Sequence, residues 1–256
     1  MPARPASVLA VIPHPDDESY AMAGALHAAA RAGARVHVLS ATRGERGDDF
    51  TIAPPGRAGP SDLGARRSRE LAASCAVLGA SPPTFLDLPD GGLTALPAGR
   101  LEAALIDALR EFSPRVVLGI GPDGAYGHAD HLALAGALIQ AASWAMAAPR
   151  LLWAAFPRGL FDPQWRRMAG GGDAALVAAA APRLGVDSDT VDLTLPVDAA
   201  VKRASIEAHR SQLPDGHAES LFPPGIVAAL LREEWYRLAS GPPLPAGAAG
   251  VLDGLA

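Results

Sequence analysis

The chain has almost no cysteine, no long hydrophobic run and no excess of positive charge. Its one cysteine, Cys75, excludes an internal disulfide and a cysteine-based zinc site. Cys75 lies in a helical apolar pattern, so we expect a buried, inert thiol. No apolar run is long enough to span a bilayer, and Val8–Ile12 is too short for the core of a signal peptide. These absences favour a cytoplasmic protein.

The charge balance also limits the partners. The sequence holds 22 Lys and Arg against 27 Asp and Glu, for a net charge of −5. This balance predicts no basic patch, so we expect neither nucleic acid nor a membrane as a partner. A small molecule is the expected partner, and the sequence leaves a homo-oligomer open.

Alternating strand and helix patterns run along most of the 256 residues, of which 49% are hydrophobic. Continuous apolar runs predict strands at Ser7–Ile12, Arg35–Ala41, Pro83–Leu88, Arg115–Ile120, Arg150–Phe156 and Val191–Leu195. Apolar spacing and end signals predict helices at Ala21–Ala32, Asp62–Leu78, Ala98–Phe112, Asp130–Ala147, Ala199–Gln212 and Ile226–Leu238. The pattern indicates one α/β domain over 1–256, with a mostly parallel sheet covered by helices on both faces. Its core covers about 7–212, and a loosely ordered tail begins at Ser240.

Two clusters of polar side chains follow strands of this predicted sheet. The segment His14–Glu18 comes directly after the first strand, and Tyr126–His131 follows the strand that ends at Ile120. Ligands bind at the carboxyl ends of the strands in open α/β sheets. Imidazoles and carboxylates are good ligands for zinc and related ions. The two clusters therefore predict one metal site built from both.

The spacing of these side chains suggests their roles. His14, Asp17 and His131 supply the three protein ligands that a catalytic zinc site needs beside an open position. Asp16 is then left next to the metal, where a free carboxylate is suited to act as a general base. His128 also remains free and could, as an imidazolium, stabilise an oxyanion or protonate a leaving group.

Asp130 would then orient the ring of His128 and raise its basicity.

Simpler interpretations exist for each cluster alone. An Asp-Asp-Glu run at a helix start can merely complement the helix dipole, and a His-x-x-His pair is often surface decoration. The joint occurrence of both clusters, each after a buried strand, favours the metal site.

At these residues the sequence resembles the PIG-L/LmbE family of metal-dependent N-acetylglucosaminide deacetylases. That family has a Pro-His-Pro-Asp-Asp-Glu motif, as at Pro13–Glu18, and a His-x-Asp-His motif, as at His128–His131. Weaker similarities follow in the family's order at Thr42–Gly47, Arg67–Leu71, Leu88–Leu93 and from Lys202 to Gln212. No recognised motif follows Gln212.

The resemblance implies a Rossmann-like α/β fold and one zinc ion held by the same three ligands, with Asp16 as the base. It implies substrate contacts for Glu45, Arg67 and Asp90, and places Tyr126 over the reacting carbonyl. Each of these four has a simpler interpretation. Arg67 suits a solvated arginine, Glu45 and Asp90 suit turns, and Tyr126 suits packing under the loop.

The implied reaction is hydrolysis of an N-acetyl group to acetate and a free amine. The ligand set also accepts iron(II). Two alternatives remain: metal-dependent hydrolysis of another amide or an ester, and a non-catalytic metal-binding or sugar-binding module. The unpaired carboxylate of Asp16 argues against the last. A dinucleotide site is excluded because no Gly-x-Gly-x-x-Gly follows the first strand.

Overall fold

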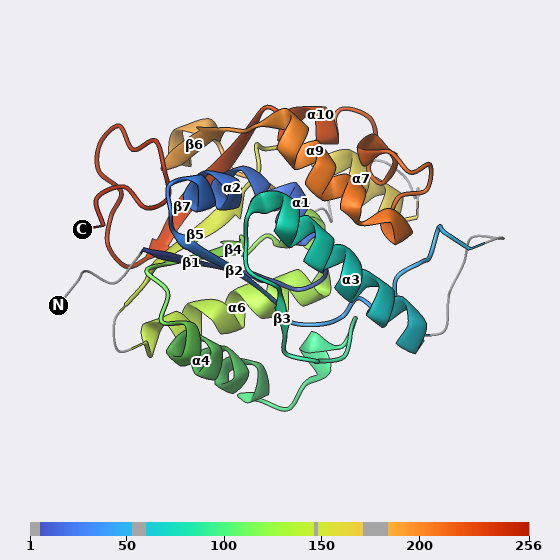
Figure 1. Ribbon diagram of the computed structural model, residues 1–256, viewed down its shortest axis with the longest axis horizontal. Coiled ribbons are helices and arrows are strands. Elements are labelled where there is room, and N and C mark those ends of the chain that lie inside the picture. Colours follow the sequence, from blue (N-terminus) through green and yellow to red (C-terminus); the bar gives the residue numbers. More distant parts are fainter. Residues whose placement is uncertain (1–5, 53–59, 146–147, 171–183, 256) are drawn as a thin grey trace.

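The computed structural model describes residues 6–52, 60–145, 148–170 and 184–255 of the chain. Its centre is a seven-stranded sheet in the order β3-β2-β1-β4-β5-β7-β6 (Figure 1). The strands are β1 (Ser7–Ile12), β2 (Arg35–Ser40), β3 (Thr84–Phe85), β4 (Val116–Ile120), β5 (Arg150–Ala155), β6 (Leu193–Pro196) and β7 (Glu233–Ser240). The first five strands run parallel, whereas β7 pairs antiparallel with both β5 and β6. The predicted mostly parallel sheet is confirmed.

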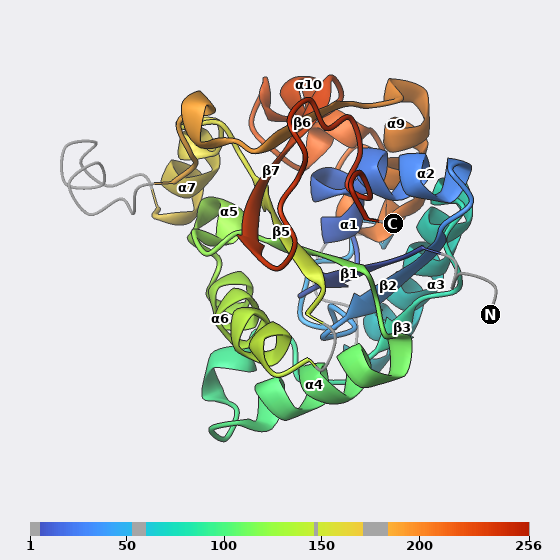
Figure 2. The ribbon, with the colours of Figure 1, turned by 90° about the vertical axis from the view of Figure 1, so that its left-hand side faces the viewer.

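Helices cover both faces of this sheet (Figures 1 and 2). The described helices are α1 (Asp17–Ala21), α2 (Ala23–Arg31), α3 (Pro60–Leu78), α4 (Arg100–Phe112), α5 (Gly124–Gly127), α6 (Ala129–Ser143), α7 (Asp162–Met168), α9 (Ala199–Ala208) and α10 (Ile226–Leu230). One apolar core joins the sheet to α2, α3, α9 and α10, and a second core joins it to α4 and α6. Every residue of β1 and β4 is buried, as expected for strands covered on both sides.

The order of the strands determines where the two polar clusters lie. β1 pairs with β2 on one side and with β4 on the other, so the order reverses between β1 and β4. The loops that leave these two strands therefore diverge to opposite faces and open a crevice at their carboxyl ends. The segment after β1 contains His14–Glu18, and the segment after β4 contains Tyr126–His131.

The predicted helix Ile226–Leu238 is wrong in its second half. Only Ile226–Leu230 is helical, and Glu233–Ser240 forms β7 inside the sheet. Glu234 of β7 is buried, where its carboxylate accepts hydrogen bonds from the Lys202 ammonium (2.6 Å) and from the amides of Gly24 (2.8 Å) and Ala25 (2.9 Å). The two amides belong to the first turn of α2, whose free N–H groups attract a carboxylate. These partners lie far away in the sequence, so local spacing does not reveal them.

Smaller differences concern element ends. The helix predicted over Ala21–Ala32 begins earlier, at Asp17, and is interrupted at Met22. The end of the helix predicted to Ala147 and most of the Gly- and Ala-rich stretch before Leu184 lie outside the described residues. None of the described helices is long and apolar enough to cross a membrane.

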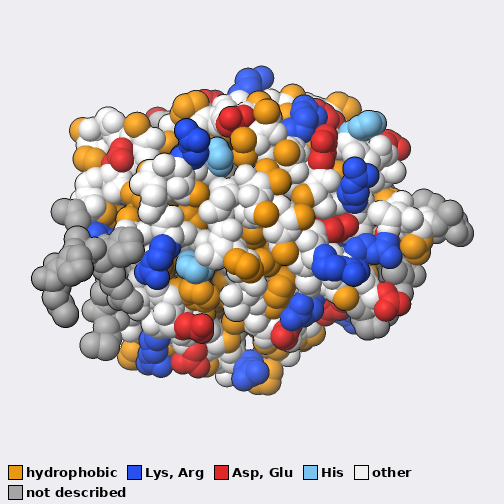
Figure 3. Space-filling model, viewed as in Figure 1, with side chains coloured by type: hydrophobic (Ala, Val, Ile, Leu, Met, Phe, Trp, Pro, Cys, Tyr) orange, Lys and Arg blue, Asp and Glu red, His pale blue; other side chains and the backbone are white. Residues whose placement is uncertain are grey.

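The segment after Ser240 contains neither helix nor strand as far as Leu255. It is nevertheless tied to the sheet, because the buried guanidinium of Arg150 donates hydrogen bonds to the carbonyls of Pro242, Pro243, Val251 and Asp253. On the face seen in Figure 3, Lys and Arg side chains are interspersed with Asp and Glu side chains.

Candidate metal centre

The loop after β1 is sharply turned at Asp16. This residue has a φ of 120°, a region that a residue with a Cβ rarely adopts. Its amide donates a hydrogen bond to Glu18 Oε2 (3.1 Å), and its carbonyl accepts one from Ser19 N (2.9 Å). The amide of His14 donates to Asp17 Oδ2 (3.1 Å). The turn thereby brings the side chains of His14 and Asp17 together.

The imidazole of His14 is surrounded by carboxylates. Its Nδ1 lies 3.5 Å from Asp17 Oδ2, and its Nε2 lies 3.2 Å from Asp90 Oδ1 and 3.3 Å from Asp130 Oδ2. Burial lowers the pKa of His14, but the hydrogen bonds with Asp130, Asp17 and Asp90 outweigh it and hold the pKa well above its ordinary value. The crevice is therefore strongly anionic and favours a cation.

His128 and His131 reach the same place from the segment after β4. His128 is the residue before α6, and its Nδ1 accepts a hydrogen bond from Asp130 N (3.2 Å). The ring centroids of His14 and His128 are 4.9 Å apart, those of His14 and His131 5.4 Å, and those of His128 and His131 4.8 Å. The structure thus brings together the two sequence clusters.

His131 tests whether a metal fits this centre. The side chain is 1% exposed, yet neither ring nitrogen has a hydrogen-bond partner among the described residues. Burial lowers the pKa of His131 to about 3, so the ring is neutral and keeps a lone pair. Its Nε2 lies 3.5 Å from Asp17 Oδ1, and the other oxygen of Asp17 faces His14. A divalent cation would satisfy these groups, so the residues fit a metal ion.

His128 differs from the other two imidazoles. It shares a site with them, since donor atoms of all three lie within 4.8 Å of one another. Because its Nδ1 accepts the Asp130 amide, the neutral ring carries its proton at Nε2. Burial and the charge of His14 lower the pKa of His128, which favours a neutral ring that acts as a donor over the imidazolium expected from the sequence. A protonated Nε2 offers no lone pair to a metal.

The carboxylate of Asp130 has a different partner from the predicted one. Its oxygens accept hydrogen bonds from Gly91 N (2.7 Å) and Leu93 N (3.1 Å) and contact His14, whereas only its backbone amide reaches His128. Asp130 therefore ties the first turn of α6 to the loop after β3 and supports His14.

Asp16 lies at this centre and is paired with Arg67 of α3. The Asp16 Oδ2 atom is 3.2 Å from Arg67 Nη2. Burial raises the pKa of Asp16 to about 6, although the charge of Arg67 lowers it. A carboxylate with a pKa near neutrality is well suited to accept a proton from water.

The predicted substrate residues Glu45, Arg67 and Asp90 make hydrogen bonds within the protein. Arg67 is 4% exposed and donates to the carbonyls of Gly44 (3.0 Å) and Pro15. Glu45 Oε1 accepts from Asp90 N (2.9 Å), while Asp90 Oδ2 accepts from Arg46 N (2.7 Å). These bonds connect the loops that follow β1, β2 and β3.

Tyr126 is in contact with the imidazoles. Its ring centroid is 5.5 Å from that of His131 and 6.0 Å from that of His128. It also packs against Phe161 and Phe222, so the simpler interpretation of a packing aromatic holds for its ring. Burial raises the pKa of Tyr126, which keeps its hydroxyl protonated as a donor.

Glu18 has no predicted role, although it belongs to the first motif. The carboxylate is fully buried and accepts hydrogen bonds from Ser19 Oγ (2.7 Å) and Ser74 Oγ (2.6 Å), and it contacts His209 Nε2 (2.7 Å). Ser205 Oγ joins the two serines. This network holds the backbone of Asp16 through the second oxygen of Glu18. Its only signal in the sequence is the position of Glu18 in the motif.

Buried imidazole and carboxylate donors at the carboxyl ends of parallel strands, beside a carboxylate of raised pKa, are features of a metal-dependent hydrolase built on an α/β sheet. Residues 9–142 match the family described as "PIG-L: GlcNAc-PI de-N-acetylase". The 1D-myo-inositol 2-acetamido-2-deoxy-alpha-D-glucopyranoside deacetylase of Nakamurella multipartita is 34% identical over 95% of this chain and 92% of that protein. The protein of the same name from Corynebacterium glutamicum is 31% identical over 98% and 97%. The chain belongs to the PIG-L family, as the motifs implied.

Solved structures show the same fold at low sequence identity. The 4-carboxy-2-hydroxymuconate hydratase from Pseudomonas putida KT2440 superposes with a TM-score of 0.66 at 19% identity, over 95% of this chain and all of that chain. The N,N'-diacetylchitobiose deacetylase from Pyrococcus horikoshii superposes with a TM-score of 0.59 at 18% identity, over 91% and 83%. One of these proteins is a hydratase and the other a deacetylase, so the fold alone does not define the reaction.

Proposed function

We propose that this protein removes the N-acetyl group from a small N-acetylglucosaminide and releases acetate. The observation that carries this proposal is His131, a buried neutral imidazole without a hydrogen-bond partner among the described residues. It faces Asp17, which also faces His14. We assign His14, Asp17 and His131 as ligands of a divalent cation, because this donor set suits zinc and also accepts iron(II).

A divalent cation held there supplies Lewis acidity to the acetyl carbonyl and lowers the pKa of water. Asp16 accepts the proton of the attacking water, since its pKa of about 6 leaves it ionised at neutral pH. Arg67 holds the Asp16 carboxylate in place by a contact of 3.2 Å. Asp16 then holds the proton that the departing amine needs.

His128 carries its own proton at Nε2 and lies beside the rings of His14 and His131. This N–H donates a hydrogen bond to the oxyanion of the tetrahedral intermediate, and the proton for the departing amine comes from Asp16. The hydroxyl of Tyr126 stays protonated and is positioned by the same group of rings. Together these donors make amide hydrolysis the reaction that best suits the geometry.

The substrate class follows from the relatives. Proteins at 31–34% identity along nearly the whole chain are named for a glucosaminyl inositol. We propose a glucosaminide with a small polar aglycone for this chain as well. The proposed location remains the cytoplasm expected from the sequence.

Acetate release from a panel of N-acetylglucosaminides tests the proposal. The panel should include N-acetylglucosaminyl inositol, N,N'-diacetylchitobiose and N-acetylglucosamine, each with the chelated protein and after addition of zinc or iron(II). Activity should disappear on chelation and return with one of the metals. A protein that binds one metal ion per chain and releases acetate from none of these compounds would exclude the deacetylase function and leave another amide or ester as substrate.

A further inference from the structure

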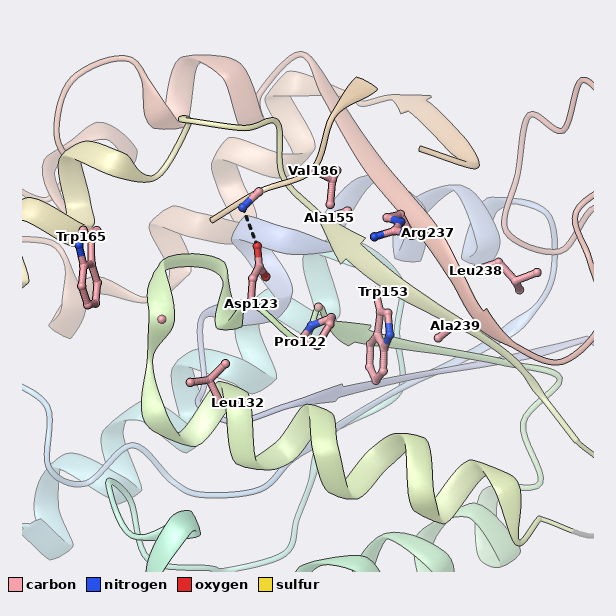
Figure 4. Close-up of a pocket in the computed structure, with 13 residues that line it drawn as sticks. Pro122, Asp123, Leu132, Trp153, Ala155, Trp165, Val186, Arg237, Leu238 and Ala239 are labelled. Carbon is pink, nitrogen blue, oxygen red and sulfur yellow. Dashed lines mark hydrogen bonds between the residues drawn. The ribbon is translucent and has the colours of Figure 1, made fainter. Parts of the chain in front are cut away.

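A cavity of about 800 Å³ lies beside the metal centre, within the range of roughly 300–1,000 Å³ of small-molecule sites (Figure 4). It is lined by residues of the segment after β4, of the first turn of α6, of β5 and β7, of α7, and of the segment at Gly185 and Val186. None of the residues assigned to the metal centre lines it. The cavity is therefore a second hollow of the molecule, and the proposed deacetylation does not account for it.

The cavity lies between the first turn of α6 and the face of the sheet formed by β5 and β7. Trp153 of β5 and Arg237 of β7 are paired in register, so their side chains share one face of the sheet. The indole of Trp153 packs onto Gly119 of β4, where an added Cβ would lie 2.7 Å from the ring. Leu132 of α6, which is 41% exposed, lines the opposite wall. The floor and wall are thus apolar and aromatic.

The two charged side chains that line the cavity, Asp123 and Arg237, differ in their hydrogen bonding. Asp123 is fully engaged, since its two carboxylate oxygens accept hydrogen bonds from Ala125 N (3.1 Å) and Gly185 N (2.8 Å), and Figure 4 shows the second bond. Arg237 lines the same cavity with an exposed side chain, and no hydrogen bond or ion pair satisfies its guanidinium within the described residues. A cation beside an apolar aromatic floor recognises a ligand that has a ring system and an anionic group.

We propose that this cavity binds an apolar ring compound with one carboxylate or sulfonate group. The ring system lies against Trp153 and Leu132, and the anionic group pairs with Arg237. A purely apolar ligand would gain nothing from the charge of Arg237, and a small inorganic anion would leave the apolar floor exposed.

One short segment of the chain separates the cavity from the metal centre. Gly127 lines the cavity, whereas the adjacent Tyr126 and His128 contact the imidazole cluster. The separating segment contains Ala125 in a left-handed conformation with a φ of 64°. Asp123 holds the beginning of this segment in place. A ligand in the cavity therefore contacts the back of the turn that positions Tyr126 and His128.

Titration with 8-anilinonaphthalene-1-sulfonate, an anionic ring compound, tests the proposal on the full chain. We expect saturable binding at one site per chain, weakened about tenfold or more in Arg237→Gln. Arg232→Gln is the matched control, because Arg232 is an exposed arginine just before β7 that does not line the cavity. Uncharged 1-anilinonaphthalene should bind the wild type and Arg237→Gln equally.

Tryptophan emission gives a second readout that needs no loss of binding. The bound probe should quench the protein, and Trp153→Phe should reduce that quenching while the affinity changes little, because Trp153 is one of two tryptophans that line the cavity and Trp165 is the other. Equal sulfonate affinity in Arg237→Gln and Arg232→Gln would overturn the proposal, as would the absence of saturable binding. Sedimentation of both variants tests whether a second copy of the chain, and not a small molecule, occupies the cavity. A dimer that dissociates in Arg237→Gln, with unchanged probe affinity, would also overturn the proposal.

Discussion

Replacing Arg67 by methionine is expected to move the acidic limb of the pH–rate profile to higher pH. Arg67 is buried, and its guanidinium lies 3.2 Å from the Asp16 carboxylate. The proposed base, Asp16, acts in its ionised form, so we expect kcat/KM to rise with pH through its pKa. Removal of a neighbouring positive charge raises that pKa, and the limb therefore shifts in the alkaline direction.

The contact distance sets the size of the shift. Two unit charges 3.2 Å apart interact by about 5 kcal/mol at an effective dielectric constant of about 20. This energy corresponds to about four pKa units at 1.36 kcal/mol for each unit. Relaxation of the loop and entry of water reduce the effect, so we expect an observed shift of at least about one unit.

The assay is kcat/KM for acetate release as a function of pH, with the metal content of each preparation measured in parallel. Arg67→Lys should shift the limb less, because it keeps the charge but cannot reach the carbonyls of Gly44 and Pro15 as well as Asp16. Arg66→Met is the matched control, since Arg66 is the adjacent residue of α3 and pairs with Asp49 (2.9 Å). It should leave the limb in place.

Substrate contact by Arg67, as implied by the family resemblance, makes the opposite prediction. Loss of uniform binding raises KM and leaves the pKa of the base unchanged. An unmoved acidic limb together with a KM raised about tenfold or more would refute the positioning role and restore the substrate-binding role.

Three further predictions concern the same centre. Asp16→Asn should keep the metal and lose about 10²–10⁴ in kcat, and full activity would remove Asp16 as the base. His131→Gln should bind less than one metal ion per chain after dialysis, measured by elemental analysis, whereas an unchanged metal content would exclude His131 as a ligand. Burial lowers the pKa of His209, but Glu18 outweighs it and raises the pKa. The stabilisation is therefore complete below about pH 6.5 and is lost as the pH rises through the folded-state pKa. In urea unfolding, the loss of stability in His209→Gln should shrink from about pH 6 to about pH 9, and a constant loss would exclude the charged pair.

The parallel half of the fold could be predicted from the sequence because its signals are local. β1 has the predicted bounds Ser7–Ile12, and β4 differs from its prediction by one residue. Buried parallel strands consist of continuous apolar residues, which local reading detects. The prediction for the residues of β7 was wrong because their burial depends on partners that are distant in the sequence. The burial of Glu234 depends on Lys202 and on two amides of α2 more than 200 residues away, and no local pattern shows these partners.

In the candidate site, too, local motifs predicted some contacts, whereas contacts that depend on distant loops could not be predicted. Two motifs that each follow a buried strand predicted the proximity of His14 and His131 from the sequence, and the structure adds that these strands, β1 and β4, are neighbours in the sheet. The partner of the Asp130 carboxylate could not be predicted in that way. Its nearest imidazole in sequence is His128, yet the loop after β3 brings Gly91 and His14 to it instead. Such a choice depends on how a third loop packs, and the motif spacing carries no information about it.

The internal hydrogen bonds of the predicted substrate residues change how the site should recognise its substrate. Arg67 links the loops after β1 and β2. The loops after β2 and β3 are linked by Glu45, which accepts from the Asp90 amide, and by Asp90, whose carboxylate accepts from the Arg46 amide. Asp130 extends this connection to α6. A side chain that rotated away from these partners toward a sugar hydroxyl would release a hydrogen bond that links the loops around the candidate metal centre. We infer that these residues hold the metal centre in its working geometry before the substrate arrives, which reduces the reorganisation needed during the reaction.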